Sequence, residues 1–292
     1  MFEQLGLIGC GLMGGSFALA LKRAGLVKRV VGYSKSPSTT ERARQLGIID
    51  VEAPSALLAV SGADIVLLAV PVSATEATFK AIRHLVNPNT LIMDVGSTKR
   101  DVVDAARRVL RDHVGCFVPA HPIAGREVSG VEHADADLYS GKQVILTPIE
   151  RTFTVQLQKA VDVWTALGCD VVKMSPQAHD AAYAAVSHLP HLIAFALINS
   201  ISGQAQGKDH LALAGSGFRD FTRIAASDPK MWRDILIANK EELLEQSRIF
   251  QASLNALEKL IANADGDGLE AQINQASQTR ANWRISTPKS PR

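Results

Sequence analysis

The sequence is poor in cysteine and in uncompensated charge. Its three cysteines, Cys10, Cys116 and Cys169, are too few and too scattered for a disulfide framework or a closed zinc site. The 31 lysines and arginines are balanced by 29 aspartates and glutamates, which leaves a net charge of +2. Nucleic acids and anionic membranes are bound by clustered, uncompensated cations, so we expect neither as a partner.

Long apolar runs are also scarce. A membrane span needs about 20 consecutive apolar residues, and no stretch approaches that length without interruption. Residues 5–21 are apolar enough to imitate a signal peptide, but they contain five glycines and lack both a basic leader and a cleavage site. We therefore expect a soluble, cytoplasmic protein, since the few cysteines also suit a reducing compartment.

Short apolar runs alternate with helical patterns up to about residue 173. This alternation predicts an α/β fold, a doubly wound Rossmann-type parallel sheet with helices on both faces. Ser36 and Pro37 predict the start of one helix, which Gly47 ends, and Gly25 ends the helix before it. We assign residues 1–174 to a dinucleotide-binding domain. The expected strands are residues 5–8, 30–33, 65–69, 91–95, 116–119, 144–147 and 170–174.

Helical periodicity takes over after residue 175 and continues to about residue 262, interrupted by a glycine-rich loop at 203–217. We assign residues 175–279 to an all-helical substrate and dimerisation domain. Residues 280–292 are basic and contain two prolines and no acidic residue, so we expect a flexible tail.

An apolar residue recurs at every seventh position near the end of the helical domain, and the pattern predicts one long helix with an apolar seam. We expect the seam to pack mainly within its own domain, and a role between subunits is the alternative. The seam consists of Leu236, Leu243, Phe250 and Leu257.

The pattern G-x-G-x-x-G lies between an expected strand and an expected helix, at Gly9, Gly11 and Gly14. Gly9 permits a tight turn, Gly11 lets a pyrophosphate approach the backbone, and Gly14 lets the helix pack close to the strand. Leu12 and Met13 open the helix, whose N-terminus faces the anion. An ordinary glycine turn is the alternative, but the surrounding β/α pattern favours dinucleotide binding.

The residues at the end of the second expected strand determine whether NAD or NADP is preferred. An acidic residue there binds the ribose of NAD and repels the 2′-phosphate of NADP. Here Ser34, Lys35 and Ser36 supply donors and a positive charge that suit a phosphate. We predict that NADP is favoured over NAD; the alternative is that Lys35 is a surface cation and Ser36 only a helix cap.

Candidate catalytic residues follow the later strands, where a doubly wound sheet binds its ligand. Val70 and Pro71 follow the third expected strand and are expected beside the cofactor, as is Ser97 after the fourth. His121 follows the fifth and is the best candidate for a general base, because a neutral imidazole can take a hydroxyl proton as hydride leaves the same carbon. Ser97 is placed to hydrogen-bond that imidazole or the substrate.

Two segments of the helical domain carry polar groups that a core does not favour. The first is S-H-L-P-H at 187–191, and the second contains Arg223, which suits bidentate capture of a carboxylate. An H-x-x-H pair, with His179 and Asp180 nearby, can also form half of a metal site. Pro190 and the absence of a third ligand at zinc-site spacing favour a site without a metal.

Five motifs occur in a fixed order along the chain: G-x-G-x-x-G-G-S at 9–16, D-x-G-S-x-K at 94–99, H-P-x-A-G-x-E-x-S-G at 121–130, S-H-L-P-H at 187–191 and G-F-R-D-x-T-R-I-A at 217–225. From about residue 5 to about residue 262, this order resembles the prephenate/arogenate (cyclohexadienyl) dehydrogenase family of tyrosine biosynthesis. The resemblance implies oxidative decarboxylation of prephenate or arogenate, to 4-hydroxyphenylpyruvate or tyrosine, with hydride transfer to NAD(P)+.

The resemblance also implies roles for individual residues. His121 is then the base on the ring hydroxyl, and Ser97 orients the imidazole or the substrate. Arg223 clamps a substrate carboxylate, His191 lines the substrate site, and Glu127 belongs to its polar network.

Members of the family are typically homodimers joined through the helical domain. The resemblance therefore implies that Asp220 or Trp232 lies near a neighbouring subunit's site. Ser216 interrupts a glycine run that many members have, which leaves open the shape of that substrate-binding loop and the choice between prephenate and arogenate.

Two other functions remain open from the sequence. A 3-hydroxyacid dehydrogenase has a similar two-domain build, but such enzymes use a lysine of the helical domain where this chain has His188 and His191. A non-catalytic dinucleotide sensor is the second alternative.

Overall fold

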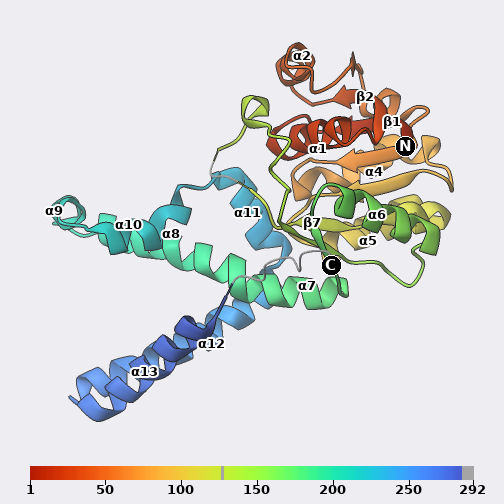
Figure 1. The fold of residues 1–292 in the computed structure, drawn as a ribbon. Coiled ribbons are helices and arrows are strands. Elements are labelled where there is room, and N and C mark those ends of the chain that lie inside the picture. Colours follow the sequence, from red (N-terminus) through yellow and green to blue (C-terminus); the bar gives the residue numbers. More distant parts are fainter. Residues whose placement is uncertain (126–127, 285–292) are drawn as a thin grey trace.

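The computed structural model describes residues 1–125 and 128–284. Figure 1 shows a body built around a sheet, from which a set of helices projects. The strands of the body are β1 (Phe2–Ile8), β2 (Val27–Tyr33), β3 (Val51–Glu52), β4 (Ile65–Leu68), β5 (Leu91–Asp94), β6 (Phe117–Val118), β7 (Ala120–Pro122), β8 (Gln143–Leu146) and β9 (Asp170–Lys173). Its helices are α1 (Leu12–Arg23), α2 (Pro37–Gln45), α3 (Ala56–Val60), α4 (Thr75–Ile82), α5 (Arg100–Leu110) and α6 (Thr154–Ala166).

The main sheet has the strand order β3-β2-β1-β4-β5-β6, and all its pairings are parallel. The order reverses between β1 and β4, which makes it doubly wound, as predicted. Tyr33, Ile8, Leu68 and Asp94 form one row across the four central strands. The loops that follow these strands therefore leave the sheet at the same edge.

Helices cover both faces of this sheet, as the apolar strands require. Phe17 of α1 and Trp164 of α6 pack together on one face, with ring centroids 5.0 Å apart. On the other face, α3, α4 and α5 enclose a second core, in which Phe79 lies edge to face against Phe117 at 5.1 Å.

The last strands depart from the prediction of a single parallel sheet. Residues 120–122 form β7, which pairs antiparallel with β8, and β8 pairs parallel with β9 in a separate three-stranded sheet. The chain turns at Pro119, which has no N–H to extend the ladder of the two-residue strand β6. His121 consequently lies within a strand rather than after one. The two-residue strand β3 was also not predicted.

The projecting helices are α7 (Pro176–Tyr183), α8 (Leu189–Ser202), α9 (Gly207–Ala212), α10 (Ser216–Thr222), α11 (Pro229–Ala238), α12 (Lys240–Ala262) and α13 (Gly266–Asn282). A π-helical turn at Ala184–His188 joins α7 to α8. Pro190 explains this wider turn, because a proline has no N–H for an i→i−4 bond and its ring collides with the carbonyl at that position.

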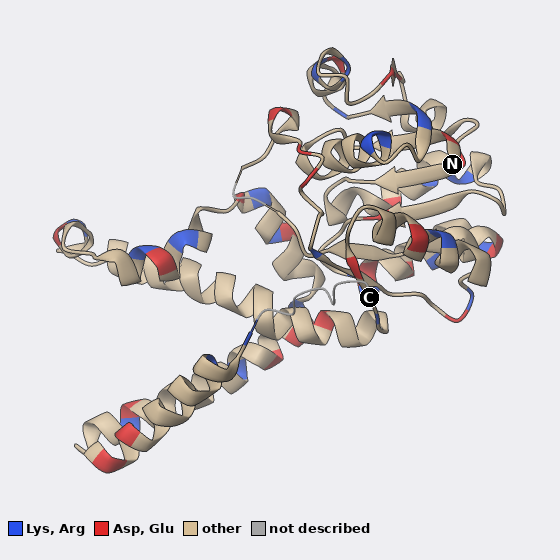
Figure 2. Cartoon of the chain, viewed as in Figure 1, with Lys and Arg blue, Asp and Glu red and all other residues tan. Residues whose placement is uncertain are grey.

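The joined run Pro176–Ser202 is 27 residues long, with a mean hydropathy of 1.6 in its most apolar window, of which only 17% is buried. By length and composition it is apolar enough to cross a membrane, which differs from the expectation drawn from the sequence. Figure 2 shows charged residues of both signs mixed over the body, whereas α8 contains no Lys, Arg, Asp or Glu.

Three predictions for the helical part were wrong in detail. The loop expected at 203–217 contains α9. The expected flexible tail begins too early, since α13 runs to Asn282, while residues 285–292 lie outside the described part of the chain. The long seam helix is broken at Asn239, so Leu236 belongs to α11 and the rest of the seam to α12.

The seam is only partly covered within its own chain. Figure 1 shows α12 and α13 extending away from the body as an antiparallel pair. Leu243 is buried at the root of α12, and Leu236 and Leu257 are half-buried, but Phe250 and the adjacent Leu254 are 36% and 42% exposed. One copy of the chain therefore covers part of the seam and leaves the part around Phe250 exposed.

Candidate active site

The glycine-rich loop after β1 has the geometry of a phosphate cradle. Gly9 has a φ of +96°, and a Cβ there would collide with the carbonyl of Ala69. A Cβ on Gly14 would collide with the carbonyl oxygen of Gly9. At Gly11 no atom lies within 4 Å of the Cβ position, and no side chain caps α1, which begins with Leu12 and Met13. The loop thus leaves open space at an uncapped helix N-terminus, which fits a dinucleotide pyrophosphate.

The residues after β2 surround the same loop with hydroxyl groups. Ser34 Oγ accepts a hydrogen bond of 2.8 Å from the backbone N–H of Cys10 in the glycine loop. Ser36 occupies the N-cap of α2 without a capping bond, and its hydroxyl lies 2.9 Å from that of Ser38. Lys35 is exposed, and residues 33–40 contain no acidic side chain.

The segment after β4 also lies against the glycine-rich loop. Val70 is half-buried, and its backbone nitrogen lies 3.3 Å from the Cβ position of Gly9. Pro71 follows it and is exposed. Val70 therefore borders the glycine loop, and a contact of Val70 or Pro71 with the cofactor stays a prediction.

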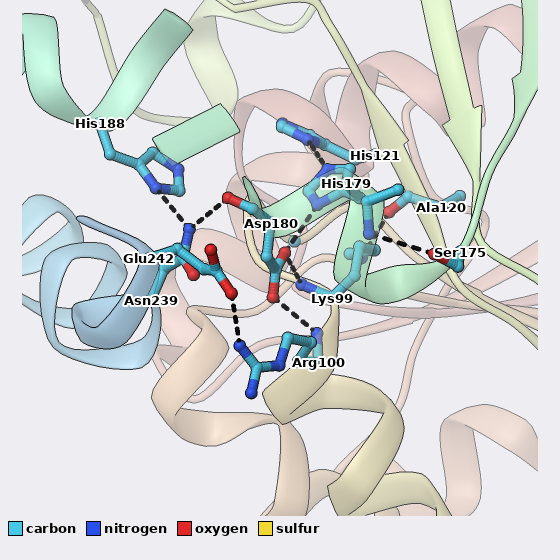
Figure 3. A network of polar contacts seen from close by, with 12 residues as sticks. Lys99, Arg100, Ala120, His121, Ser175, His179, Asp180, His188, Asn239 and Glu242 are labelled. Carbon is cyan, nitrogen blue, oxygen red and sulfur yellow. Dashed lines mark hydrogen bonds and ion pairs between the residues drawn. The ribbon is translucent and has the colours of Figure 1, made fainter. Parts of the chain in front are cut away.

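His121 stands at the head of a chain of buried polar groups, drawn in Figure 3. Its Nδ1 lies 2.8 Å from Nε2 of His179, and Nδ1 of His179 lies 2.7 Å from Asp180 Oδ1. The Asp180 carboxylate also accepts hydrogen bonds from the backbone N–H groups of Lys99 and Arg100, at 2.8 and 2.9 Å. The chain joins β7, the start of α7 and the N-terminus of α5.

A buried ion pair fixes the backbone next to His121. Lys99 Nζ donates to Asp94 Oδ2 at 2.5 Å and to the carbonyl of Ala120 at 2.8 Å. The backbone N–H of Ala120 donates in turn to Asp94 Oδ1 at 3.0 Å. Because both charged groups are buried and well hydrogen-bonded, removal of either would leave an unpaired charge in the interior.

Ser97 is not the hydrogen-bond partner of Nδ1 of His121. The Nδ1 atom of His121 is engaged by His179, and within the described residues the Ser97 hydroxyl makes no hydrogen bond. The Nδ1 atom thus has a partner other than Ser97, and a role of Ser97 in orienting the imidazole stays a prediction. A contact of Ser97 with the substrate or the cofactor stays a prediction, since this half-buried residue follows β5 at the same sheet edge as the glycine loop.

The electrostatics keep these rings neutral. Burial holds the pKa of His121 well below its ordinary value, and the nearby His179 and Lys99 act in the same direction. Burial also lowers the pKa of His179. Burial acts to raise the pKa of Asp180, but hydrogen bonds from His179 and from the N–H groups of Arg100 and Lys99 outweigh it and keep the carboxyl ionised.

Asn239 links this chain to a second group of rings. Its amide nitrogen donates to the backbone carbonyl of Asp180 at 2.8 Å and to Nδ1 of His188 at 3.1 Å. Burial lowers the pKa of His188 to about 4, and among the described residues its buried Nε2 has no hydrogen-bond partner. His191 stacks on the buried Trp232 of its own chain, with ring centroids 3.5 Å apart.

The contacts of the histidines do not suit a metal site. His179 bonds Asp180, His188 accepts from an amide, and Nδ1 of His191 lies 2.9 Å from the carbonyl of Ser187. In residues 1–125 and 128–284 no three metal-ligating side chains gather.

Two of the predicted substrate residues lie away from His121 within one chain. Ser216 and Asp220 lie on α10, which Figure 1 places at the far end of α8 from the body, and Asp220 pairs with Arg219 at 3.2 Å. Arg223 follows α10 at the start of the 3₁₀ turn Arg223–Ala226 and is exposed. Glu127 lies outside the described residues.

The sequence did not assign catalytic parts to His179, Asp180, Tyr183 or Asn239. Tyr183 stacks on His179 at 4.6 Å and also contacts the ring of His121 at 4.9 Å. The adjacent polar pair His179 and Asp180 is a signal in the sequence, but it was interpreted only as part of a possible metal site. Asn239 gave no signal, because the seven-residue repeat continues across it.

A hollow of about 410 Å³ lies behind this chain, between α5 and the start of α7. Two of its lining residues, Arg100 and Arg107, already pair with Glu242 and Glu150. It therefore does not compete with the surroundings of His121 as a site for an anion.

Comparisons with known proteins agree with this geometry. The family model described as prephenate dehydrogenase, nucleotide-binding domain, matches residues 17–173. The model described as prephenate dehydrogenase, dimerization domain, matches residues 175–275.

Individual relatives match along nearly their whole length. A cyclohexadienyl dehydrogenase of Zymomonas mobilis is 36% identical, with 96% of each chain covered. The crystal structure of prephenate dehydrogenase from A. aeolicus, in complex with hydroxyphenyl propionate and NAD+, has a TM-score of 0.90 and 38% identity, covering 96% of this chain and 98% of that one. A Synechocystis arogenate dehydrogenase has a TM-score of 0.82 and 29% identity, covering 97% of this chain and 100% of that one.

Proposed function

Since this chain belongs to the prephenate dehydrogenase family, we propose that it oxidatively decarboxylates a cyclohexadienol, prephenate or arogenate, with a nicotinamide dinucleotide as hydride acceptor. The observation that carries the proposal is His121, a neutral imidazole whose Nδ1 is already bonded and whose Nε2 is left to act as a base. It stands at the same edge of the molecule as the glycine loop.

The residues of the chain suit this reaction step by step. When bound, the nicotinamide ring accepts a hydride from the ring carbon that carries the hydroxyl group. His121 takes the hydroxyl proton at Nε2, so that the carbon becomes a carbonyl carbon. Loss of carbon dioxide then leaves its electron pair in the ring, which becomes aromatic with a negative phenolate oxygen. The proton on His121 can return to that oxygen, and the imidazole is again neutral.

Charged and aromatic groups of the helical part supply substrate recognition. Arg223 clamps a substrate carboxylate, and the stacked pair of His191 and Trp232 lines the pocket for the ring. Ser216 and Asp220 reach the site of a partner subunit rather than their own, which accounts for their distance from the body.

Arg223→Ala tests this assignment. The substitution removes an ionic clamp that acts on bound substrate and transition state alike, so KM rises while kcat changes little. Steady-state kinetics of the purified variant give the two parameters separately. A fall in kcat with an unchanged KM contradicts the clamp.

The preferred cofactor is NADP rather than NAD. Ser34, Lys35 and Ser36 supply the end of β2 with hydroxyl groups and one cation, and no carboxylate stands there to repel a 2′-phosphate. Gly9, Gly11 and Gly14 with the start of α1 hold the pyrophosphate, and Val70, Pro71 and Ser97 border the nicotinamide.

The working form is a homodimer joined through the helical part. A family model for a dimerization domain covers this region, α12 exposes apolar side chains along its length, and the apolar side chains of α8 are mostly half-buried. A second copy of this chain would cover them, and this explains the apolar run Pro176–Ser202 without a membrane. The net charge of +2 and the charges of both signs mixed over the body favour no nucleic-acid partner.

The enzyme works as a soluble protein of the cytoplasm. Its three cysteines are free and buried, and burial raises the pKa of the Cys10 thiol to about 11. Such thiols need no oxidising compartment and react slowly.

A two-by-two assay tests the proposed function. Purified enzyme is mixed with prephenate or arogenate and with NAD or NADP, and reduction of the cofactor and release of carbon dioxide are followed together. We expect both signals in equal amounts with at least one substrate, and faster with NADP. No turnover with either substrate would favour a dinucleotide sensor, and a clear advantage for NAD would contradict the cofactor preference.

A further inference from the structure

The contacts of Asp180 determine which ring nitrogens of the histidines carry protons. An ionised carboxylate only accepts hydrogen bonds. Asp180 accepts from the backbone N–H groups of Lys99 and Arg100, and Nδ1 of His179 lies 2.7 Å from its Oδ1. That nitrogen must therefore carry a proton and donate it.

The assignment passes from one ring to the next. With its proton on Nδ1, neutral His179 has a lone pair on Nε2, which lies 2.8 Å from Nδ1 of His121. The second ring must then donate from Nδ1, and its Nε2 is left without a proton. We propose that His179 and Asp180 are positioning residues that hold His121 in the one neutral tautomer able to accept a proton at Nε2.

Packing holds the rings in the orientation that this requires. Tyr183 lies nearly parallel to His179, at an angle of 23°, and it also contacts His121. Asn239 binds the backbone carbonyl of Asp180, and the N-terminus of the 11-residue helix α5 meets the carboxylate. When His121 takes up a proton at Nε2, its Nδ1–H still donates to His179, which donates in turn to the negatively charged Asp180. This connection stabilises the imidazolium.

The inference rests on the proposed function for the statement that His121 is the base, but the tautomer itself can be observed without turnover. Nitrogen-15 chemical shifts of histidine side chains distinguish protonated from unprotonated ring nitrogens. In the wild-type enzyme we expect a protonated Nδ1 and an unprotonated Nε2 for both His121 and His179. The opposite assignment in either ring overturns the proposal.

Asp180→Asn is the sharpest variant. Oδ1 of Asp180 faces both the N–H of Lys99 and Nδ1 of His179, and Oδ2 accepts from the N–H of Arg100, so an Asn amide sets its NH₂ against a backbone donor in either orientation. The variant removes the negative charge that holds the proton on Nδ1 of His179 and that stabilises the imidazolium of His121. We expect kcat to fall roughly 10²–10⁴-fold, the size of a lost general base, with little change in KM.

His179→Leu and the double variant separate this effect from a structural one. The single variant cuts the connection, so His121 samples both tautomers, its imidazolium loses the path to the carboxylate, and we expect kcat to fall. With the connection cut, Asp180→Asn has no path to His121, so the double variant should match His179→Leu. A double variant markedly slower than His179→Leu contradicts the proposal.

His179→Gln keeps the proposal testable if Asp180→Asn does not fold. A Gln amide can donate to Asp180 from its nitrogen and accept from His121 at its oxygen, so we expect kcat close to wild type and an unchanged tautomer of His121. Dinucleotide affinity and thermal unfolding report whether each variant is intact. If the wild type turns over neither cyclohexadienol, the proposed function fails while the nitrogen-15 shifts still decide this inference.

Discussion

At the scale of single residues, the site depends on histidines that burial keeps neutral. An exposed histidine has a pKa of about 6.5 and is largely protonated in mild acid, where it cannot act as a base. Burial, His179 and Lys99 all lower the pKa of His121. His121 therefore stays deprotonated, and able to accept a proton, below the ordinary histidine pKa of about 6.5.

This predicts the acid limb of the pH profile. The value of kcat/KM reports the free enzyme, and the base is active only when deprotonated. Because the pKa of His121 is lowered, we expect kcat/KM to hold as the pH falls through about 6.5 and to decline only below it. A half-loss of kcat/KM at or above that pH contradicts the neutral base.

Two glycine substitutions in the loop distinguish an effect on folding from an effect on cofactor binding. Gly11 has a φ of −75°, and its Cβ position is empty, so Gly11→Ala should unfold at the wild-type temperature while it raises the Kd for the dinucleotide about tenfold or more. Gly14→Ala is the matched comparison, since its Cβ collides with the Gly9 carbonyl and should destabilise the fold by roughly 1–3 kcal/mol. Calorimetry of each variant with and without cofactor measures both quantities. Unchanged affinity in Gly11→Ala would remove the loop from cofactor binding.

At the scale of elements, side chains near the site interrupt helices that the sequence pattern predicts as regular. The seven-residue repeat predicts one helix through Leu236 and Leu243, yet the chain breaks at Asn239, whose side chain turns inward to Asp180 and His188. Such a break depends on partners 51 and 59 residues away, which periodicity does not contain. The only signal in the sequence for the π-turn before α8 is Pro190.

The exposed apolar side of α12 leads to a prediction about assembly. Leu254 is 42% exposed in one chain, and a lysine in its place would put a charge into the proposed interface. We expect Leu254→Lys to weaken the dimer by roughly tenfold or more, as at other central interface contacts. Light scattering over a concentration series measures this, with Gln251→Lys, at an exposed polar position of the same helix, as the control. Equal loss in both variants, or in neither, contradicts an interface at the seam.

At the scale of the whole molecule, the candidate site forms where the sheet-containing body meets the helical part. The sequence predicted the doubly wound sheet and His121 because strand patterns and glycine spacing are local signals. It did not predict that His179 would replace Ser97 as the partner of His121, since this contact joins β7 to a helix 58 residues further along the chain. It also predicted one sheet where the turn at Pro119 produces two.

The central claim is that this chain uses His121 as the base in the oxidation of a cyclohexadienol. The most direct measurement compares wild type and His121→Asn in reduction of the nicotinamide cofactor with prephenate or arogenate, with dinucleotide affinity measured on the same samples. We expect kcat of the variant to fall by roughly 10²–10⁴-fold, the usual contribution of a general base, while the affinity is unchanged. Equal turnover by the two proteins would contradict the mechanism.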